Sequence, residues 1–254
     1  MTQVESPQSF VVQGECTKAA WQHGYRVSLG EDAGWAGFRS TTAQGTIWLA
    51  AAGHHGPWYL ALDHSGVEAE LGLAEVDIAG PGIARHAFAD TGALYAVLIR
   101  QYQLAVSLPN APLHEFLERT RGLPKTTEAE RLVVQRVGQD VFRDGLLQYW
   151  QGRCPLTDIA DPVLLRASHI KPWKDCETDS ERLDVHNGLL LSALWDAAFD
   201  AGLVTFNDDG SPEFSVHLSA EARSSLCFRE RLCLTQKHKG FLEWHRAMVF
   251  QFQG

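Results

Sequence analysis

Three polar residues within apolar surroundings are the positions of this chain best suited to chemistry. His169 stands in an apolar stretch, Asn187 follows eighteen residues later, and Asp196 follows after nine more. Asp200 comes four residues after Asp196, about one turn of a helix. A neutral imidazole can take a proton from water near neutral pH, and a carboxylate can hold a divalent cation. A buried histidine, a loop asparagine and an acid on a short helix can together form a metal-dependent phosphodiesterase.

The residues around these three predict two strands and a helix. Residues 164–170 and 188–191 are short apolar runs typical of strands, with a polar loop between them. Ser192 is an N-cap candidate for a helix over residues 193–200, and Gly202 suits its end. This order puts the histidine at the end of the first strand, the asparagine before the second strand and both acids on the helix.

Further helices are expected on either side of this unit. A long helix is predicted over residues 126–150, because its apolar residues recur at three- and four-residue spacing and Thr126 or Thr127 can cap its start. The apolar residues of this stripe are Leu132, Val133, Val137, Val141, Phe142 and Leu146. Beyond the two strands, a hairpin is expected over residues 203–216 and a helix over residues 240–251.

The first half of the chain is predicted to be rich in β-strands. Fourteen of the 22 glycines lie before residue 125, where they separate short apolar runs such as residues 25–29, 45–51 and 57–62. Residues 91–102 fit either a helix or a buried strand. Four tryptophans of this half are expected in the core, with stacking on nucleobases as the alternative. They are Trp21, Trp35, Trp48 and Trp58.

Gly122 and Pro124 mark the clearest domain boundary, since both residues end regular structure. We therefore expect an α+β protein with a β-rich domain over residues 1–122 and a second domain over residues 123–254.

Composition limits the function classes. No apolar run reaches about 18 residues, so a membrane span is not expected. The five cysteines are spread widely without a Cys-x-x-Cys pair, which argues against a disulfide framework or a four-cysteine zinc site and favours a reducing, cytoplasmic setting. The net charge of −9 is unusual for a protein that binds nucleic acid, which commonly has a basic face.

Three motifs carry a resemblance to a known family. They are Ala167-Ser-His-Ile-Lys-Pro-Trp173, Asn187-Gly-Leu-Leu-Leu191 and Leu194-Trp-Asp-Ala-Ala-Phe-Asp-Ala-Gly-Leu203. Their wording and their strand–loop–strand–helix order resemble the HNH endonucleases, in the ββα-metal form of restriction-type bacterial nucleases. The resemblance covers roughly residues 150–210 and does not reach the β-rich half. It implies a C-terminal nuclease domain that hydrolyses DNA phosphodiester bonds.

The resemblance also implies roles for the residues. His169 is the general base, Asn187 ties the loop to the histidine strand, and Asp196 binds the metal, for which Mg²⁺ or Mn²⁺ suits a carboxylate best. Many relatives have an acid immediately before the histidine, where this chain has Ser168. Ser168 could act as a weak ligand, and Asp200 or His186 could complete the set, although both could equally be structural.

Four basic residues are candidates for contact with DNA. Arg166 and Lys171 flank the histidine, and Arg182 could hold a phosphate with two hydrogen bonds or could pair with Asp184. Arg246, next to His245 on the last predicted helix, could reach the site or remain on the surface.

Restriction-type defence is the natural setting for such a nuclease, with the β-rich domain as a reader of a sequence or a modified base by analogy. Symmetric cutting of duplex DNA often involves a dimer, so a homodimer is one option. A catalytically inactive nucleic-acid-binding or regulatory protein is the alternative, favoured by Ser168 and the acidic balance. A toxin effector with a protein-binding first half is another.

Overall fold

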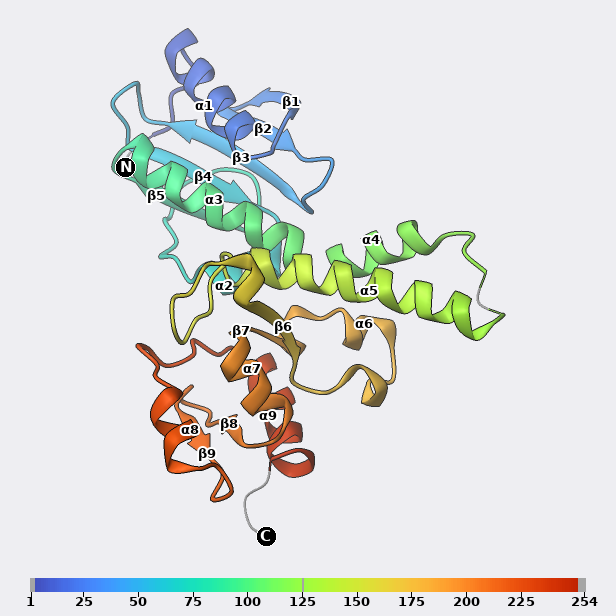
Figure 1. Ribbon diagram of the computed structural model, residues 1–254. Helices are drawn as coiled ribbons and strands as arrows, with labels where there is room; N and C mark the ends of the chain where they lie inside the picture. Colours follow the sequence, from blue (N-terminus) through green and yellow to red (C-terminus); the bar gives the residue numbers. More distant parts are fainter. Residues whose placement is uncertain (1–2, 125, 251–254) are drawn as a thin grey trace. The chain divides into compact units, whose positions relative to one another are not determined.

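A computed structural model describes residues 3–124 and 126–250 of the chain (Figure 1). The fold contains both helices and sheets, with a β-rich first part, which confirms the predicted α+β class. By compactness the chain separates into two units, Met1–Ala111 and Pro112–Gly254. The predicted boundary at residue 122 lies further along, in the loop before the long helix. No helix among the described residues is long and apolar enough to cross a membrane.

The first unit is built on one antiparallel sheet of five strands in sequential order. The strands are β1 (Val27–Asp32), β2 (Trp35–Arg39), β3 (Thr46–Ala51), β4 (Trp58–Leu62) and β5 (Ala84–Phe88). Each strand pairs with the next, although the connection from β4 to β5 spans residues 63–83 and includes a helix, and the β1–β2 register shifts between Ser28 and Gly30. The central strands β3 and β4 are almost fully buried, so both faces of the sheet are covered there.

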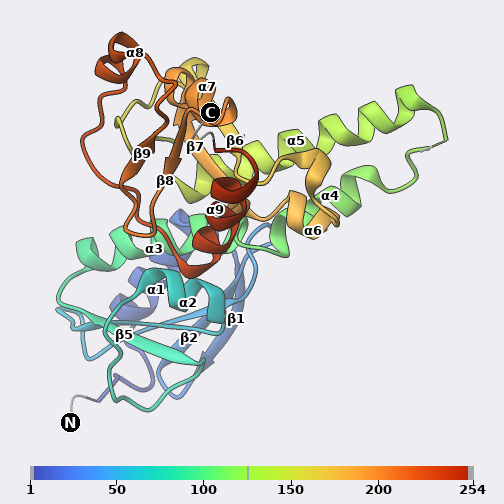
Figure 2. The same ribbon diagram turned by 90° about the horizontal axis from the view of Figure 1, so that it is seen from below.

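Helices cover one face of this sheet. The helix α1 (Phe10–Gln22) contacts β2 and β3, and α3 (Thr91–Ser107) contacts β4 and β5; both lie on the same side of the strands in Figure 2. The short helix α2 (Ser65–Leu71) packs against α3. Residues of alternate strand positions, such as Leu49 and Leu60, form the buried core beneath these helices.

The opposite face carries aromatic side chains instead of helices. Trp35, Tyr59 and two alanines form a small buried cluster there, with Trp48 packed against its edge. The coil between α2 and β5 covers part of this face, because Val76 and Ile78 pack on the cluster. Trp35 is 2% and Trp58 is 3% exposed, as expected for core residues, whereas Trp21 is 51% exposed.

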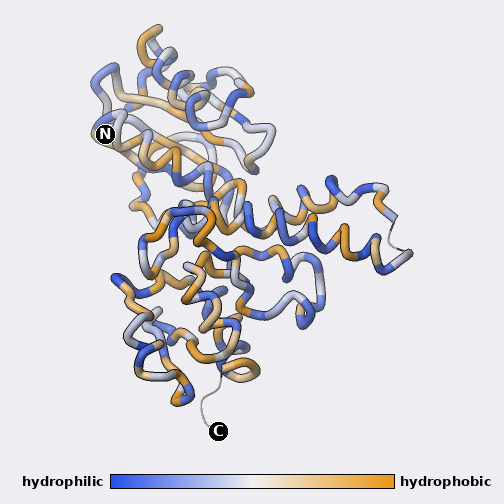
Figure 3. Tube along the Cα trace, viewed as in Figure 1, coloured by the Kyte–Doolittle hydropathy of each residue, from blue (hydrophilic) through white to orange (hydrophobic). Residues whose placement is uncertain are grey.

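The second unit begins with two helices, α4 (Ala111–Thr120) and α5 (Glu128–Tyr149). Thr127 and Glu130 form a capping box at the start of α5, which satisfies its first amide groups. Along α5, hydrophobic and hydrophilic residues alternate in the manner of an amphipathic helix (Figure 3). The apolar stripe of its second half is buried, including Phe142 and Leu146.

The predicted strand–loop–strand–helix unit follows. Strand β6 (Leu165–His169) pairs antiparallel with β7 (Gly188–Ser192), and α7 (Ala193–Asp200) follows β7 directly. A 3₁₀ turn, Pro162–Leu164, precedes β6. The loop between the strands contains the 3₁₀ turns Trp173–Asp175 and Val185–Asn187 and, between these turns, the short helix α6 (Asp179–Arg182). The helix has the predicted bounds, although the side chain of Ser192 makes no capping hydrogen bond.

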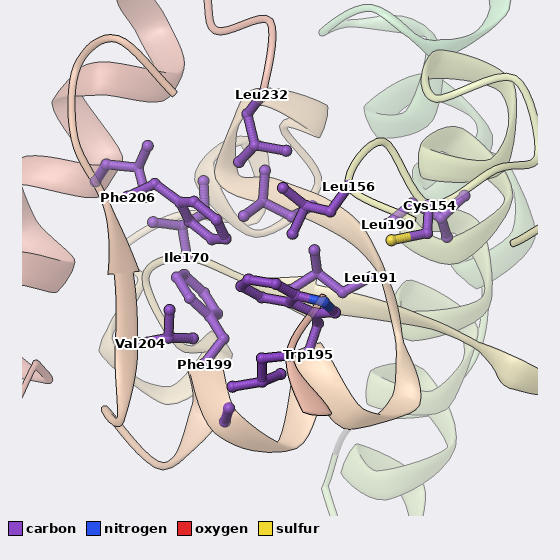
Figure 4. Packing of buried hydrophobic residues seen from close by; sticks show 14 of the residues in the cluster. Cys154, Leu156, Ile170, Leu190, Leu191, Trp195, Phe199, Val204, Phe206 and Leu232 are labelled. Carbon is purple, nitrogen blue, oxygen red and sulfur yellow. The ribbon is translucent and has the colours of Figure 1, made fainter. Parts of the chain in front are cut away.

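The rest of the unit completes the core around α7. The hairpin β8 (Val204–Phe206) and β9 (Pro212–Phe214), the helix α8 (Ala220–Ser225) and the helix α9 (Gln236–Met248) follow in order. In Figure 4, Trp195 and Phe199 of α7 lie among Ile170, Phe206 and Leu232, all of which are 3% exposed or less. The helix α9 begins at Gln236, earlier than the predicted start at residue 240. Its predicted end at Gln251 lies outside the described residues.

Gly188 gives a direct test of how closely β7 packs on α5. A Cβ atom at this position would lie 2.5 Å from Cζ of Phe142 and 2.8 Å from a methyl carbon of Leu146. We expect Gly188→Ala to lower the free energy of unfolding by about 1–3 kcal/mol, measured by urea denaturation, because the two layers must separate.

Gly240→Ala in α9 is the control, since nothing lies within 4 Å of its added Cβ. This variant should be more stable by about 0.5–1 kcal/mol, because alanine is the better helix former. Equal stability of the two variants would contradict the close packing of β7 on α5.

Candidate active site

His169 ends β6 and lies between aromatic rings. Its imidazole stacks on Phe142 of α5, with ring centroids 3.7 Å apart and an interplanar angle of 14°. The indole of Trp173 meets it edge-on at 5.7 Å. These contacts fix the plane of the imidazole, and the pairing of His169 with Gly188 fixes its backbone.

The hydrogen bond of His169 defines its tautomer. Nε2 lies 2.9 Å from the carbonyl oxygen of Arg182, which can only accept, so Nε2 carries the proton and Nδ1 is the basic atom of the ring. Burial lowers the pKa of His169 to about 4, against a smaller opposite effect of this hydrogen bond. The imidazole is therefore neutral near pH 7 and can accept a proton at Nδ1.

Asn187 joins the two ends of the loop between the strands. Its side chain is fully buried, accepts a hydrogen bond from the amide of Lys171 at 2.8 Å and donates to the carbonyl of the same residue at 3.1 Å. It also donates to the carbonyl of Glu181 at 3.2 Å. Because an unpaired buried amide is costly, these bonds hold the residues after His169 at a fixed distance from β7.

Arg182 and Lys171 also hold this loop in place. The guanidinium of Arg182 donates to the carbonyls of Trp173 and Cys176 at 3.2 and 2.6 Å, and to the carboxylate of Asp179 at 2.9 Å. Lys171 forms an ion pair with Glu181 at 2.7 Å. The structure thus engages both basic side chains within the loop, while the backbone of Arg182 orients the histidine.

Ser168 and the two acids of α7 form the second part of the site. The hydroxyl of Ser168 donates to the carboxylate of Asp196 at 2.5 Å. Partial desolvation and the nearby charge of Asp196 raise the pKa of Asp200 to about 6. The two carboxylates lie one helical turn apart on the same face of α7, where like charges repel and a bound cation would relieve the repulsion.

A cavity of about 340 Å³ brings several of these residues together. Ser168, His169 and Asp200 line it, while Asp196 is not in its lining and connects to it through Ser168. The remaining lining residues are Ala167, Ile170, Pro172, Trp173, His245 and Val249. The cavity therefore combines a neutral imidazole with a hydroxyl group and a carboxyl group.

Several predicted residues point elsewhere. His186 is buried and pairs with Asp184 at 2.6 Å, within a cluster of aromatic rings. Arg246 binds the carbonyl of Phe206 and the carboxylate of Asp208, so its side chain joins α9 to the hairpin. Among the described residues, no group of three or more His, Cys, Asp or Glu side chains could hold a metal ion.

Arg166 differs from the other basic candidates. Its guanidinium binds the uncharged carbonyl oxygens of Val163 and Leu165, at 2.9 and 3.0 Å. Its positive charge is thus held beside β6 by carbonyl groups.

His245 lines the cavity but is fully engaged. It stacks on Phe199 with ring centroids 4.0 Å apart, its Nε2 donates to the carbonyl of Phe199 at 3.3 Å, and its Nδ1 accepts from Thr205 at 3.0 Å. Burial lowers its pKa to about 4. It supports the wall of the cavity as a neutral ring.

Sequence reasoning missed two supports of His169. Phe142 looked like an ordinary core position of the long helix, and no local signal connects it to a residue 27 positions away. The carbonyl of Arg182 could not be foreseen either, because every residue has a carbonyl and only the path of the loop selects one.

Replacing Arg182 by methionine should disturb the orientation of His169. Without the three side-chain bonds of Arg182, its carbonyl is no longer held, so the proton on Nε2 of His169 should exchange faster with water and the two tautomers should mix. Nitrogen NMR shifts of the imidazole measure this.

Arg166→Met is the matched control for this change, because Arg166 has no recorded contact with the imidazole. Identical His169 spectra in wild type and Arg182→Met would show that the carbonyl stays in place without the side chain.

Acid should destabilise the protein through its two neutral histidines. His169 and His245 have pKa values of about 4 when folded, below about 6.5 in the unfolded chain. The unfolded state therefore binds more protons, and the free energy of unfolding falls as pH decreases from about 6.5 to 4.

Asp200 acts in the opposite sense, because its pKa of about 6 exceeds that of an aspartate in the unfolded chain. The folded protein therefore binds more protons at this residue, which adds to the free energy of unfolding as the pH falls. Asp200→Asn should consequently make the loss of stability on acidification steeper, as measured by urea denaturation at several pH values. A slope equal to that of wild type would contradict the raised pKa.

The comparison with known proteins agrees with this geometry. Residues 154–207 match the family model described as HNH endonuclease, and this segment includes β6, the loop, β7, α7 and β8. No curated protein matches the chain. The segment 154–207, with the paired strands and helix that carry His169, Asn187 and Asp196, therefore matches the HNH endonuclease family, which confirms the resemblance seen in the sequence.

Proposed function

We propose that the protein is a metal-dependent DNA endonuclease in which His169 is the general base. The observation that carries the proposal is the orientation of the imidazole. Its Nε2–H is bound to a backbone carbonyl, so its basic Nδ1 remains for a water molecule in a cavity that also contains Ser168 and Asp200.

The low pKa of His169 is compatible with this role. It keeps the imidazole neutral at all pH values well above about 4, so the ring is always ready to accept a proton. A phosphate beside the ring would raise this pKa, because an anion stabilises the imidazolium form. Substrate binding therefore makes His169 a stronger base at the moment when a base is needed.

The oxygen donors fit Mg²⁺ or Mn²⁺. Such ions are held through one or two carboxylates and keep several waters, so the lack of a larger ligand cluster among the described residues is no obstacle. Asp196 would hold the ion, with Ser168 and Asp200 as the nearest further oxygen groups. When bound, the ion would stabilise charge on the phosphate and on the leaving oxygen.

Arg166 is the basic candidate best suited to hold the DNA backbone. Lys171, Arg182 and Arg246 each have a carboxylate partner, which reduces the attraction that remains for a phosphate. Among the residues that the structure describes, Arg166 binds carbonyl oxygens rather than a carboxylate, so its full charge can act on DNA.

A restriction-type role, with the first unit as the reader of DNA, remains part of this proposal. A homodimer would allow both strands of a duplex to be cut. The β-rich unit provides no basic surface by composition, because residues 1–111 contain five Lys and Arg against ten Asp and Glu. If this unit recognises DNA, it has few basic side chains with which to contact the phosphates.

A non-catalytic nucleic-acid-binding protein is the second candidate. The observation in its favour is the bond between Ser168 and Asp196, since a hydroxyl occupies the place where many relatives have an acid and holds the carboxylate proposed for the metal. Such a protein would keep the fold and the orientation of His169 without cutting DNA.

Plasmid nicking separates the two candidates. Purified protein should cut unmodified or cytosine-modified DNA with Mg²⁺ or Mn²⁺ and fail with EDTA. His169→Ala should reduce the rate by about 10²–10⁴-fold, the usual effect of losing a general base.

Asp196→Asn should shift the metal concentration needed for half-maximal rate upward, and His114→Ala, an exposed histidine of α4, should change nothing. Equal rates for wild type and His169→Ala would exclude His169 as the base. Absence of cutting on every substrate would favour the binding protein.

A further inference from the structure

The first unit contains a cavity that the proposed nuclease function does not use. It has a volume of about 680 Å³ and lies on the sheet face opposite α1 and α3, where Trp35 and Trp48 form part of its lining. Its walls come from Gln3, Val4 and Ser6, from Asp32 and Ala33 at the β1–β2 turn, and from the coil residues 77–81. This volume lies within the usual range for small-molecule sites.

Hydrogen bonds hold both walls against the sheet. The amide of Glu5 donates to the carbonyl of Ala51 at 2.8 Å, which fixes the N-terminal segment. The indole nitrogen of Trp35 donates to the carbonyl of Ala79 at 3.2 Å, which fixes the coil. Gly80 lies so close that an added Cβ would be 2.6 Å from the Trp35 ring. The cavity is thus formed before any ligand arrives.

The floor presents an indole at the surface of the sheet. Trp48 is partly exposed, and its ring lies over Gly37, because an added Cβ on that glycine would be 3.1 Å from two of its ring atoms. Gly30 is paired with Gly37 on the neighbouring strand, and Cβ of Leu29 lies beside this position, 3.3 Å from the same added Cβ, while the indole of Trp48 still forms part of the cavity lining. A ligand can therefore reach the indole.

The charged groups of the lining are all acidic. Asp32 and Asp77 are exposed at its walls, and the lining contains no Lys, Arg or His among the described residues. The guanidinium of Arg85 is not part of the lining and donates to the carbonyls of Gly80, Pro81 and Gly82. An anion such as a phosphate would be repelled here, and the acidic balance of the whole unit adds to this.

We propose that this cavity binds a small organic cation, such as a methylated ammonium group. Weakly hydrated cations are attracted to the face of an indole, and carboxylates at the rim add long-range attraction. Asp32 and Asp77 supply the charge, while Trp48 supplies the aromatic surface. The cation can belong to a free metabolite or to a methylated lysine side chain. This inference is independent of the proposed nuclease function.

Calorimetric titration of the full chain with choline tests the proposal against 3,3-dimethylbutan-1-ol, the uncharged carbon isostere of choline. Choline should bind at least about tenfold more tightly than the isostere, because only choline has the charge that the indole and carboxylates recognise. Equal affinities, or no binding of choline, would overturn the proposal.

Variants locate the site. The double change Asp32→Asn and Asp77→Asn should weaken choline binding by about tenfold or more, and Trp48→Leu should do so as well. Glu75→Gln is the matched control, since Glu75 is an exposed acid of the same coil outside the lining. Because both aspartates are exposed, their asparagine variants should keep the thermal stability of wild type. Unchanged choline binding in the double variant would place the ligand elsewhere.

Two further ligands identify the source of the cation. A short peptide with trimethyllysine that binds more tightly than choline, and more tightly than its unmodified lysine form, would indicate a protein partner. Choline binding as tightly as the peptide would indicate a metabolite. Deoxycytidine or deoxyadenosine binding that exceeds choline and survives the double change would overturn the proposal in favour of a nucleobase site.

Discussion

The site depends on one hydrogen bond between a buried imidazole and a backbone carbonyl. A histidine enclosed by Phe142 and Trp173 is neutral, and a neutral ring needs an acceptor for its single N–H. The carbonyl of Arg182 supplies that acceptor at 2.9 Å. The side chains of Asn187 and Arg182 hold the loop between β6 and β7 in the conformation that presents this carbonyl. The loop thereby fixes the proton of His169 on Nε2.

The strands and helices around this bond each contribute a different part of the site. Helix α5 supplies the aromatic floor under the imidazole, and the absence of a side chain at Gly188 lets β7 lie directly on that floor. Helix α7 turns its apolar residues into the core and its acids toward the other side. A short ββα unit, too small for a core of its own, thus acquires one from the helix before it and the hairpin after it.

The sequence predicted the ββα order well because its signals are local. Strand β7 and helix α7 have nearly the predicted bounds, since apolar runs and turn residues define them. Helix α1 was missed, although Val12, Cys16, Ala19 and Ala20 form its buried stripe, because small residues give a weak periodic signal. The contact of Phe142 with His169 could not be predicted, since it depends on how two distant segments pack.

The hydrogen bond between Ser168 and Asp196 orients the carboxylate of Asp196 through the protein itself. The hydroxyl proton takes the place of a cation beside the carboxylate, so this acid is already solvated by the protein and its side chain already oriented. Asp196 is therefore oriented by a protein group, in contrast to the ligands of small zinc domains, which are unfolded without metal. In the proposed nuclease, the ion would bind to a carboxylate that is already oriented, and its occupancy would follow the ionic conditions of the surroundings.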